Sequence, residues 1–414
     1  MTRFRVFVLL FAFALTGAVM YGRALWWSIA GALFALMALA VLWSWLGVNW
    51  VRVGRRALTK VGQVGQTLEE EFRITNLSRF PKLWTEFRDL SDLPGHQASR
   101  VLGLIPPKQW RGWKASTMCM DRGRFHLGPI SVRSGDPLGI YQMQRTIDIV
   151  NPLLVYPITY ELHSFPLPIG FLPGGDAQRR RTHYITTNAA GVREYAYGDS
   201  INRIHWGLTA RRQRLIVKEF ELDPMSNLWI ALDLQQATQV LAEDGALADI
   251  SQASPGLPPG LPPDTLEYAV STAASAAKYF LRQDMGVGLI AHGLHREVLP
   301  TDRGERQLAK LMEMFAVVRA QGVLSFGAVL DKELPQVGRG ATIIAISASP
   351  DVSWAVAIQR ATRSGLRVVA LVIDPASFGG PTPSGDIIAA LAETGATVRV
   401  IKCGDSIPEA VQRG

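Results

Sequence analysis

The chain has 414 residues, a formal net charge of +8 and a pI near 9.6, with 48% hydrophobic and 19% charged residues. A chain of this length and apolar content can bury two cores besides a membrane segment, and its small excess of positive charge makes a field too weak to predict a nucleic-acid partner. Its two cysteines, Cys119 and Cys403, lie far apart in the sequence, so they predict neither a disulfide framework nor a metal site.

Residues 1–50 are expected to form a transmembrane helical hairpin. The apolar stretches at residues 6–21 and 24–46 have the length of membrane spans, and only Gly22 and Arg23 interrupt them. Several tryptophans fall near the expected helix ends, as in an interfacial belt: Trp26, Trp27, Trp43, Trp45 and Trp50. A cleaved signal peptide is the alternative, but no small-x-small cleavage site follows Met20 and a second apolar span begins at once.

Charged residues beside the two spans predict their orientation. Arg23 alone lies in the turn, whereas the outer ends are flanked by Arg3, Arg5, Arg52, Arg55, Arg56 and Lys60. Positively charged residues beside a membrane span stay on the cytoplasmic side, so both ends of the hairpin are expected in the cytoplasm. We therefore expect a multi-pass protein of the cell's inner (cytoplasmic) membrane. Its soluble domains are then expected to face the cytoplasm, and the lipid bilayer is its first expected partner.

Residues 51–160 are expected to form a small β-sandwich-like domain. Short runs rich in Val, Ile, Phe and Trp are separated there by turn-forming residues, and residues 72–75 alternate between apolar and polar as a half-buried strand does. Residues 135–139, Gly-Asp-Pro-Leu-Gly, predict a turn. The sequence of this domain offers no catalytic constellation, so we interpret it as an interaction or spacer module.

Residues 161–225 are expected to hold a linker and then a signature segment. The linker, residues 162–188, combines prolines and glycines with a basic run at residues 179–181. Residues 191–221 read GVREYAYGDSINRIHWGLTARRQRLIVKEFE, where charges of both signs stand beside aromatic residues and can form one network. The candidate interaction residues are Arg193, Glu194, Tyr195, Gly198, Asp199, Arg203, His205, Trp206, Thr209, Arg211, Lys218 and Glu219.

The order of these residues resembles the domain of unknown function 58 family, whose hallmark reads roughly REYxxGDxxRxIHWxxSAR with a VKEFE-like end. Thr209 stands in place of the usual serine. Residues 122–141, RGRFHLGPISVRSGDPLGIY, are similar to the family's second recurring segment. The resemblance implies association with MoxR-type AAA+ ATPases and a role in assembling or remodelling protein complexes.

Residues 226–414 predict an α/β domain. Apolar strands at residues 228–232, 286–291, 342–347, 367–373 and 397–401 alternate with helices at residues 266–282, 305–319, 352–364 and 386–394. Such alternation predicts a parallel sheet covered by helices. The Pro- and Gly-rich residues 235–263 are expected to be a flexible loop. The family resemblance narrows the domain to one similar to the von Willebrand factor type A fold, which is Rossmann-like.

In that fold the first strand commonly ends in Asp-x-Ser-x-Ser, because a hard divalent cation binds a carboxylate and hydroxyl oxygens there. The matching residues are Asp233, Gln235 and Ala237, of which only Asp233 keeps an oxygen ligand of the expected kind. We therefore expect no metal and no cofactor, and we interpret Asp233 as a capping or turn residue.

Three functions remain open from the sequence. The first is a membrane-anchored, non-enzymatic scaffold that binds partner proteins, with an AAA+ ATPase as the implied partner. The second is a hydrolase or transferase in which His205 acts with Asp199 or Glu194 and activates Thr209. The third is a cation-dependent adhesion module, which requires a complete metal shell and the opposite topology.

Overall fold

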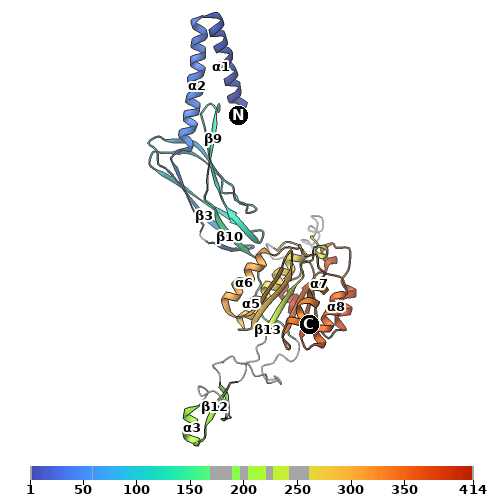
Figure 1. The fold of residues 1–414 in the computed structure, drawn as a ribbon. Helices are drawn as coiled ribbons and strands as arrows, with labels where there is room; N and C mark the ends of the chain where they lie inside the picture. Colours follow the sequence, from blue (N-terminus) through green and yellow to red (C-terminus); the bar gives the residue numbers. More distant parts are fainter. Residues whose placement is uncertain are drawn as a thin grey trace. The chain divides into compact units, whose positions relative to one another are not determined.

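The computed structural model describes residues 2–57, 59–167, 189–195, 204–220, 227–241 and 261–412. The chain divides into two compact units that meet in sequence between Ile158 and Thr159, apart from Leu261 and Met312–Val318, which group with the first unit. Figure 1 follows the elements of both units in chain order.

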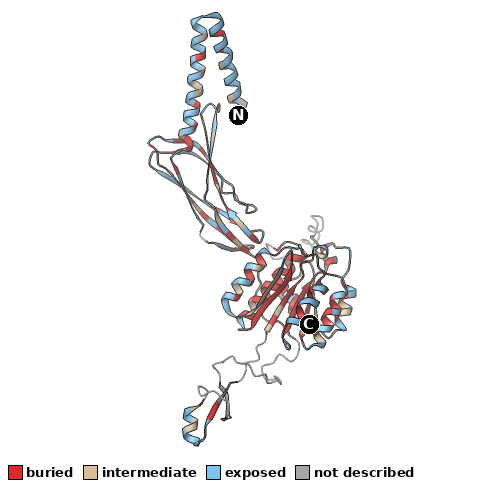
Figure 2. Cartoon of the chain, in the orientation of Figure 1, coloured by how far each residue is buried: buried red, intermediate tan, exposed pale blue. Residues whose placement is uncertain are grey.

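Two helices form the N-terminal hairpin, α1 (Thr2–Tyr21) and α2 (Ala24–Val48). They pack side by side and are joined at Gly22, whose φ of 62° lies in the left-handed region that glycine adopts freely. Most of their apolar side chains are exposed (Figure 2). Their length and composition are compatible with membrane anchoring.

The rest of the first unit is built from strands. They are β1 (Val51–Ala57), β2 (Val61–Gln63), β3 (Thr67–Asn76), β4 (Lys82–Asp89), β5 (Arg100–Ile105), β6 (Trp110–Met118), β7 (Gly123–Leu127), β8 (Ile130–Gly135), β9 (Gln142–Ile147) and β10 (Asn151–Tyr156). They form the sheets β1-β3-β6, β5-β4-β8-β9 and β2-β10-β7.

Two of these sheets share one hydrophobic core. Val53 and Ile74 of the β1-β3-β6 sheet cluster with Phe87 and Val132 of the β5-β4-β8-β9 sheet. Alternate residues of β3 are buried, which is the period-two pattern of a strand with one face in a core. The predicted β-domain therefore consists of sheets packed face to face, as in a sandwich.

Lys82, the first residue of β4, joins this core to α2. Its ammonium group donates hydrogen bonds to the carbonyls of Leu46 and Asn49, at the helix end where carbonyls lack intrahelical partners. The residue is only 1% exposed, and burial lowers the pKa of Lys82 to about 8. The Ser44 hydroxyl adds a 3.0 Å hydrogen bond to the carbonyl of Tyr141. Helix α2 is thus fixed to the sandwich by side-chain contacts as well as by the chain.

The second unit contains a six-stranded sheet. Its strands are β13 (Asn227–Leu232), β14 (Gly286–His292), β15 (Arg296–Asp302), β16 (Thr342–Ser347), β17 (Arg367–Ile373) and β18 (Thr397–Ile401), in the order β15-β14-β13-β16-β17-β18. Every pairing is parallel except that of β14 with β15. This is the strand order of doubly wound sheets, whose switch point lies at the carboxyl ends of the two central strands.

Helices cover the sheet (Figure 1). They are α5 (Thr265–Arg282), α6 (Gly304–Val317), α7 (Phe326–Glu333), α8 (Ser353–Arg363), α9 (Gly385–Ala392) and α10 (Ile407–Gln412), with short 3-10 turns at Gln236–Thr238, Leu334–Gln336 and Pro375–Phe378. Helices α7, α8 and α9 pack on one face with Trp354 fully buried among them, and α5 contacts the central strands. Buried strands between more exposed helices are visible in Figure 2.

Two expectations need correction. The sheet is mixed and not all-parallel, because β15 returns as an antiparallel edge strand directly after β14. Residues 161–167, expected as part of an exposed linker, instead pack on α5. Leu162 and Phe165 are buried, and Glu161 forms ion pairs with Lys278 and Arg282 of that helix. Residues 168–188 and 242–260, the remaining parts of the expected linker and loop, lie outside the described residues.

Candidate functional site

The signature segment folds into a hairpin with a short helix between its strands. Strand β11 (Ala189–Glu194) pairs antiparallel with β12 (Ile216–Phe220), and α3 (Trp206–Arg212) lies between them in sequence. Glu194 stands opposite Ile216 and Arg193 opposite Val217. Ile204 bridges to Val217, and these apolar residues are buried. A small apolar contact therefore holds the motif together.

His205 and Thr209 stabilise this hairpin. The Nδ1 atom of His205 accepts a hydrogen bond from the backbone N–H of Leu208 at 3.3 Å, which caps the first turn of α3. The Thr209 hydroxyl accepts a hydrogen bond from the N–H of Ile216 at 3.1 Å. The histidine proposed as a base and the threonine proposed as a nucleophile are thus both engaged with the backbone.

Trp206 and Arg211 are both exposed to solvent. Trp206 is 63% exposed although it is a large aromatic residue, and Arg211 is exposed in the last turn of α3. Tyr195 follows β11 and is half-buried. Of the remaining candidates, Lys218 and Glu219 lie in β12. Gly198, Asp199 and Arg203 lie outside the described residues, so the proposed pairing of His205 with Asp199 stays a prediction.

Asp233 lies at the carboxyl edge of the six-stranded sheet, directly after β13. Its Oδ1 accepts a hydrogen bond from the N–H of Gln235 at 2.9 Å, and its Oδ2 accepts one from the Ser347 hydroxyl at 2.6 Å. Ser347 ends β16, the neighbouring central strand, and its hydroxyl also accepts from the N–H of Ser349. The two strand ends at the switch point are therefore tied together by one buried carboxyl group.

The oxygens beside the Asp233 carboxyl group are the Ser347 hydroxyl and, at 3.5 Å, the Thr238 hydroxyl. Burial raises the pKa of Asp233 to about 6, although hydrogen bonds from Ser347 and Gln235 oppose that shift. Both carboxyl oxygens already accept hydrogen bonds, and Ala237 is exposed in a 3-10 turn without an oxygen side chain. Within the described residues, no group of three or more His, Cys, Asp or Glu side chains is placed to hold a metal. A hard cation usually takes several carboxylates or other oxygens.

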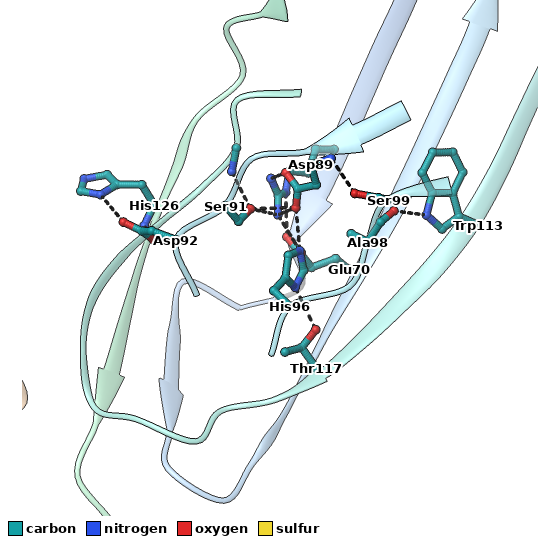
Figure 3. A network of polar contacts seen from close by, with 12 residues as sticks. Glu70, Asp89, Ser91, Asp92, His96, Ala98, Ser99, Trp113, Thr117 and His126 are labelled. Carbon is teal, nitrogen blue, oxygen red and sulfur yellow. Dashed lines mark hydrogen bonds and ion pairs between the residues drawn. The ribbon is translucent and has the colours of Figure 1, made fainter. Parts of the chain in front are cut away.

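A second buried cluster lies in the sandwich, where Figure 3 shows its carboxylates and histidine. Arg55 donates two hydrogen bonds to Glu70, both 2.8 Å, and two longer ones to Asp89. The Nε2 of His96 lies 2.7 Å from Asp89, and its Nδ1 lies 2.8 Å from the Thr117 hydroxyl. These contacts connect β1, β3, β4, β6 and the loop after β4.

The chemistry of this cluster is that of a structural ion-pair network. The side chains of Arg55, Glu70, Asp89 and His96 are at most 4% exposed. Burial alone would raise the pKa of Asp89, but hydrogen bonds from His96 and Ser91 and the charge of Arg55 bring it below its usual value. Because these charged side chains are buried and are paired with one another, a substrate has no access to them.

Sequence reasoning missed this network because its members extend from Arg55 to Thr117 and no short motif links them. Arg55 was also counted among the cytoplasmic flanking charges, whereas its side chain is buried and neutralised by carboxylates. The signal that could have found it is an arginine at an inward-facing position of a strand, since an unpaired charge does not remain in a core. Arg52 and Arg56 of the same strand are exposed.

Glu333 anchors a third cluster that the sequence did not reveal. It accepts hydrogen bonds from Arg296 at 2.7 and 2.8 Å, and the Nε2 of His292 lies 3.0 Å from it. The hydrogen bond from Arg296 is the largest of the effects that lower the pKa of Glu333, and burial opposes them. The cluster ties the end of α7 to the β14–β15 turn.

Comparisons with known proteins agree with the signature segment. Residues 191–245 match the family model described as "Protein of unknown function DUF58". The "Uncharacterized protein YeaD" of Bacillus subtilis (strain 168) is 25% identical over 199 residues, which are 48% of this chain and 43% of that protein. The chain therefore matches less than half of the length of that relative.

Two solved structures resemble parts of the chain. The match with BatB from Bacteroides thetaiotaomicron covers 45% of this chain and 94% of the BatB chain, with 16% identity and a TM-score of 0.31. The match with the pilus adhesin SpaC from Lactobacillus rhamnosus GG covers 47% of this chain and 30% of the SpaC chain, with 11% identity and a TM-score of 0.32. The family match and the distant relative agree with the resemblance of the signature segment to the DUF58 family.

Proposed function

We propose that this chain is a membrane-anchored, non-enzymatic scaffold that works with a MoxR-type AAA+ ATPase in assembling or remodelling protein complexes. The observation that carries the proposal is the Lys82 joint, which fixes an apolar helix of membrane-spanning length to a folded β-domain. A scaffold needs such a connection, because a domain fixed to its anchor is presented in a defined way. The soluble domains are proposed to face the cytoplasm, where an ATPase finds its nucleotide.

The α/β domain is proposed to be von Willebrand factor type A-like. Its sheet order, with one antiparallel edge strand, supports that interpretation. The Asp233 carboxyl group is held by Ser347 and Gln235, which supports binding without a cation. In the described part of the chain, the buried polar clusters around Arg55, Asp233 and Glu333 have the features of structural bonds, which favours a binding role over a catalytic one.

The signature hairpin is proposed to present the partner-binding surface. His205 and Thr209 hold its fold, whereas Trp206 and Arg211 are exposed on α3. Exposed tryptophan and arginine residues are enriched among those that dominate protein–protein binding energy. His205 and Thr209 are therefore proposed to form the motif, and Trp206 and Arg211 are proposed to contact the partner.

A pull-down of the tagged full chain from detergent-solubilised membranes tests this function. We expect the parent to recover an AAA+ ATPase, and a Trp206→Ala/Arg211→Glu variant to lose it at unchanged thermal stability. Arg363→Glu is the matched control, since Arg363 is an exposed arginine at the end of α8 and its variant should bind like the parent. Equal recovery with all three chains would contradict a partner surface on α3, and recovery of no ATPase by the parent would contradict the proposed partner.

A further inference from the structure

An apolar groove of about 650 Å³ runs along the N-terminal hairpin. It is lined chiefly by Phe4 of α1 and by Phe34, Met37, Val41 and Trp45 of α2. Figure 1 shows the two helices side by side, with the start of α1 near the later turns of α2. The groove therefore belongs to the half of the hairpin that adjoins the sandwich.

The dimensions of the groove match one leaflet of a bilayer. From Phe34 to Trp45 the helix rises by about 16 Å, at 1.5 Å per residue. The hydrocarbon core of a bilayer is about 30 Å thick, so the groove spans about half of it. On a hairpin that crosses the membrane, an apolar groove of that length has the shape of a site for a lipid acyl chain and not for a whole transmembrane helix.

Positive charge gathers at the sandwich end of this groove. Arg3 and Arg5 flank the groove residue Phe4 in the first turns of α1, and both are exposed. The segments that adjoin the end of α2 carry further exposed basic residues, namely Arg52, Arg79 and Lys108.

The acidic counterpart in these segments is withdrawn from the surface. Asp136, in the turn between β8 and β9, is 8% exposed, and its carboxylate accepts hydrogen bonds from the N–H groups of Leu138 and Tyr141. Phe4 packs against Tyr141 with ring centroids 5.1 Å apart, so this turn lies beside the start of α1. The end of the groove is therefore positively charged where lipid headgroups are expected, and anionic headgroups attract basic residues at a membrane surface.

We propose that the groove binds one acyl chain of an anionic phospholipid, with Arg3 and Arg5 holding its phosphate group. The site rests on the proposed function only in requiring that the hairpin spans the membrane. The ligand class is an anionic phospholipid of the leaflet on the side of the sandwich. Arg3 and Arg5 then bind a ligand, besides their effect on the orientation of the hairpin.

Native mass spectrometry of the detergent-solubilised full chain tests the proposal. The probes are dioleoyl phosphatidylglycerol, which is anionic, and dioleoyl phosphatidylcholine, which has the same acyl chains and a zwitterionic headgroup. We expect the parent to retain the anionic lipid in preference. Arg3→Gln/Arg5→Gln is expected to weaken its retention about 30-fold, the effect of two basic residues at a membrane surface.

Filling the groove tests the acyl-chain half of the site. Val41→Phe is expected to lower retention of the anionic lipid. Ala38 also lines the groove, and the milder Ala38→Leu replaces Val41→Phe if that variant aggregates. Val19→Trp is the control, because Val19 is 71% exposed on α1 and is not a groove residue. Arg23→Gln removes an arginine at the opposite end of the hairpin and should bind lipid like the parent.

Equal retention of the two lipids by the parent would overturn the proposal, as would retention unchanged by the Arg3→Gln/Arg5→Gln or groove variants. Retention of a second copy of the chain in place of lipid would overturn it as well. Alkaline carbonate extraction of membranes distinguishes failure of the lipid site from failure of the membrane anchor. A chain that stays in the membrane pellet but shows no lipid preference refutes this site alone, whereas a chain released by carbonate refutes the anchor and the site together.

Discussion

Replacing Asp233 by asparagine tests whether its buried carboxyl group is a hydrogen-bonded tie or a cation ligand. Burial raises the pKa of Asp233 to about 6, against an ordinary value of 3.8. Because the folded state holds the proton more tightly, the free energy of unfolding of the parent is expected to fall as pH rises from 3.8 to about 6, and to level off above it. The two pKa values differ by about two, which corresponds to about 3 kcal/mol.

Asp233→Asn buries no charge, so its stability relative to the parent is expected to increase over the same pH range. The increase should equal the roughly 3 kcal/mol that the parent loses. The hydrogen bond that is lost when one amide oxygen replaces two acceptors lowers the stability of the variant by about 1 kcal/mol at every pH, so its net advantage above pH 6 is about 2 kcal/mol. Hydrogen–deuterium exchange of peptides from β13 and β16 at pH 4 and pH 8, corrected for intrinsic exchange rates, reports the local free energy of opening.

Asp351→Asn is the matched control for this experiment, since Asp351 is an exposed carboxylate in the loop after β16 and accepts hydrogen bonds from Ser353. Its effect on β13 should not change over this pH range. A parent that is more stable than Asp233→Asn at pH 8, and that gains protection on addition of Mg²⁺, would refute the reasoning, because the carboxylate would then be a metal ligand.

Three further variants test the other structural claims. Arg55→Met leaves two buried carboxylates without their cation and should cost about 3–5 kcal/mol of unfolding free energy in denaturant titrations, whereas Arg56→Met, at the exposed neighbour, should stay within about 0.5 kcal/mol. Because the pKa of Asp89 is lowered on folding, the parent should also lose stability as pH falls below 3.8. Lys82→Met leaves two helix-end carbonyls without their donor and should cost about 1–3 kcal/mol, with Lys114→Met as the exposed control. Arg23→Cys should react with a membrane-impermeant maleimide added outside intact cells; labelling of Arg52→Cys instead would show the reverse topology.

The strands of the α/β unit could be predicted closely because they are continuous apolar runs. Residues 342–347 and 367–373 coincide with β16 and β17, both almost fully buried between two layers of helices. Strand β15 was missed for the opposite reason. Its sequence, REVLPTD, is half polar and contains Pro300, as suits an edge strand that pairs on one side only. Helix α7 was also missed, because it has only eight residues and therefore no long periodic pattern.

The candidate site was predictable only where one segment of sequence contains it. The motif around His205 is contiguous, so its residues could be listed, although their division into fold-forming and exposed residues could not. Asp233 was found by the Asp-x-Ser-x-Ser pattern that the family resemblance implies at the end of the first strand, but its partner Ser347 lies 114 residues away. Such a contact follows from two parallel strands ending at the same edge, and single-sequence patterns do not give side-chain pairs across that distance.

The proposed binding role rests on a contrast between buried and exposed polar residues in the described part of the chain. A catalytic carboxylate or histidine has to reach its substrate, whereas His96, Asp89 and Glu333 are enclosed by their partners. The exposed side chains of the signature are of the other kind, a tryptophan and a cation on a helix of seven residues. A helix this short is marginal by itself. The hydrogen bonds of His205 and Thr209 therefore stabilise the conformation in which Trp206 is presented, and removing them should weaken partner binding through the fold while Trp206→Ala weakens it through contact alone.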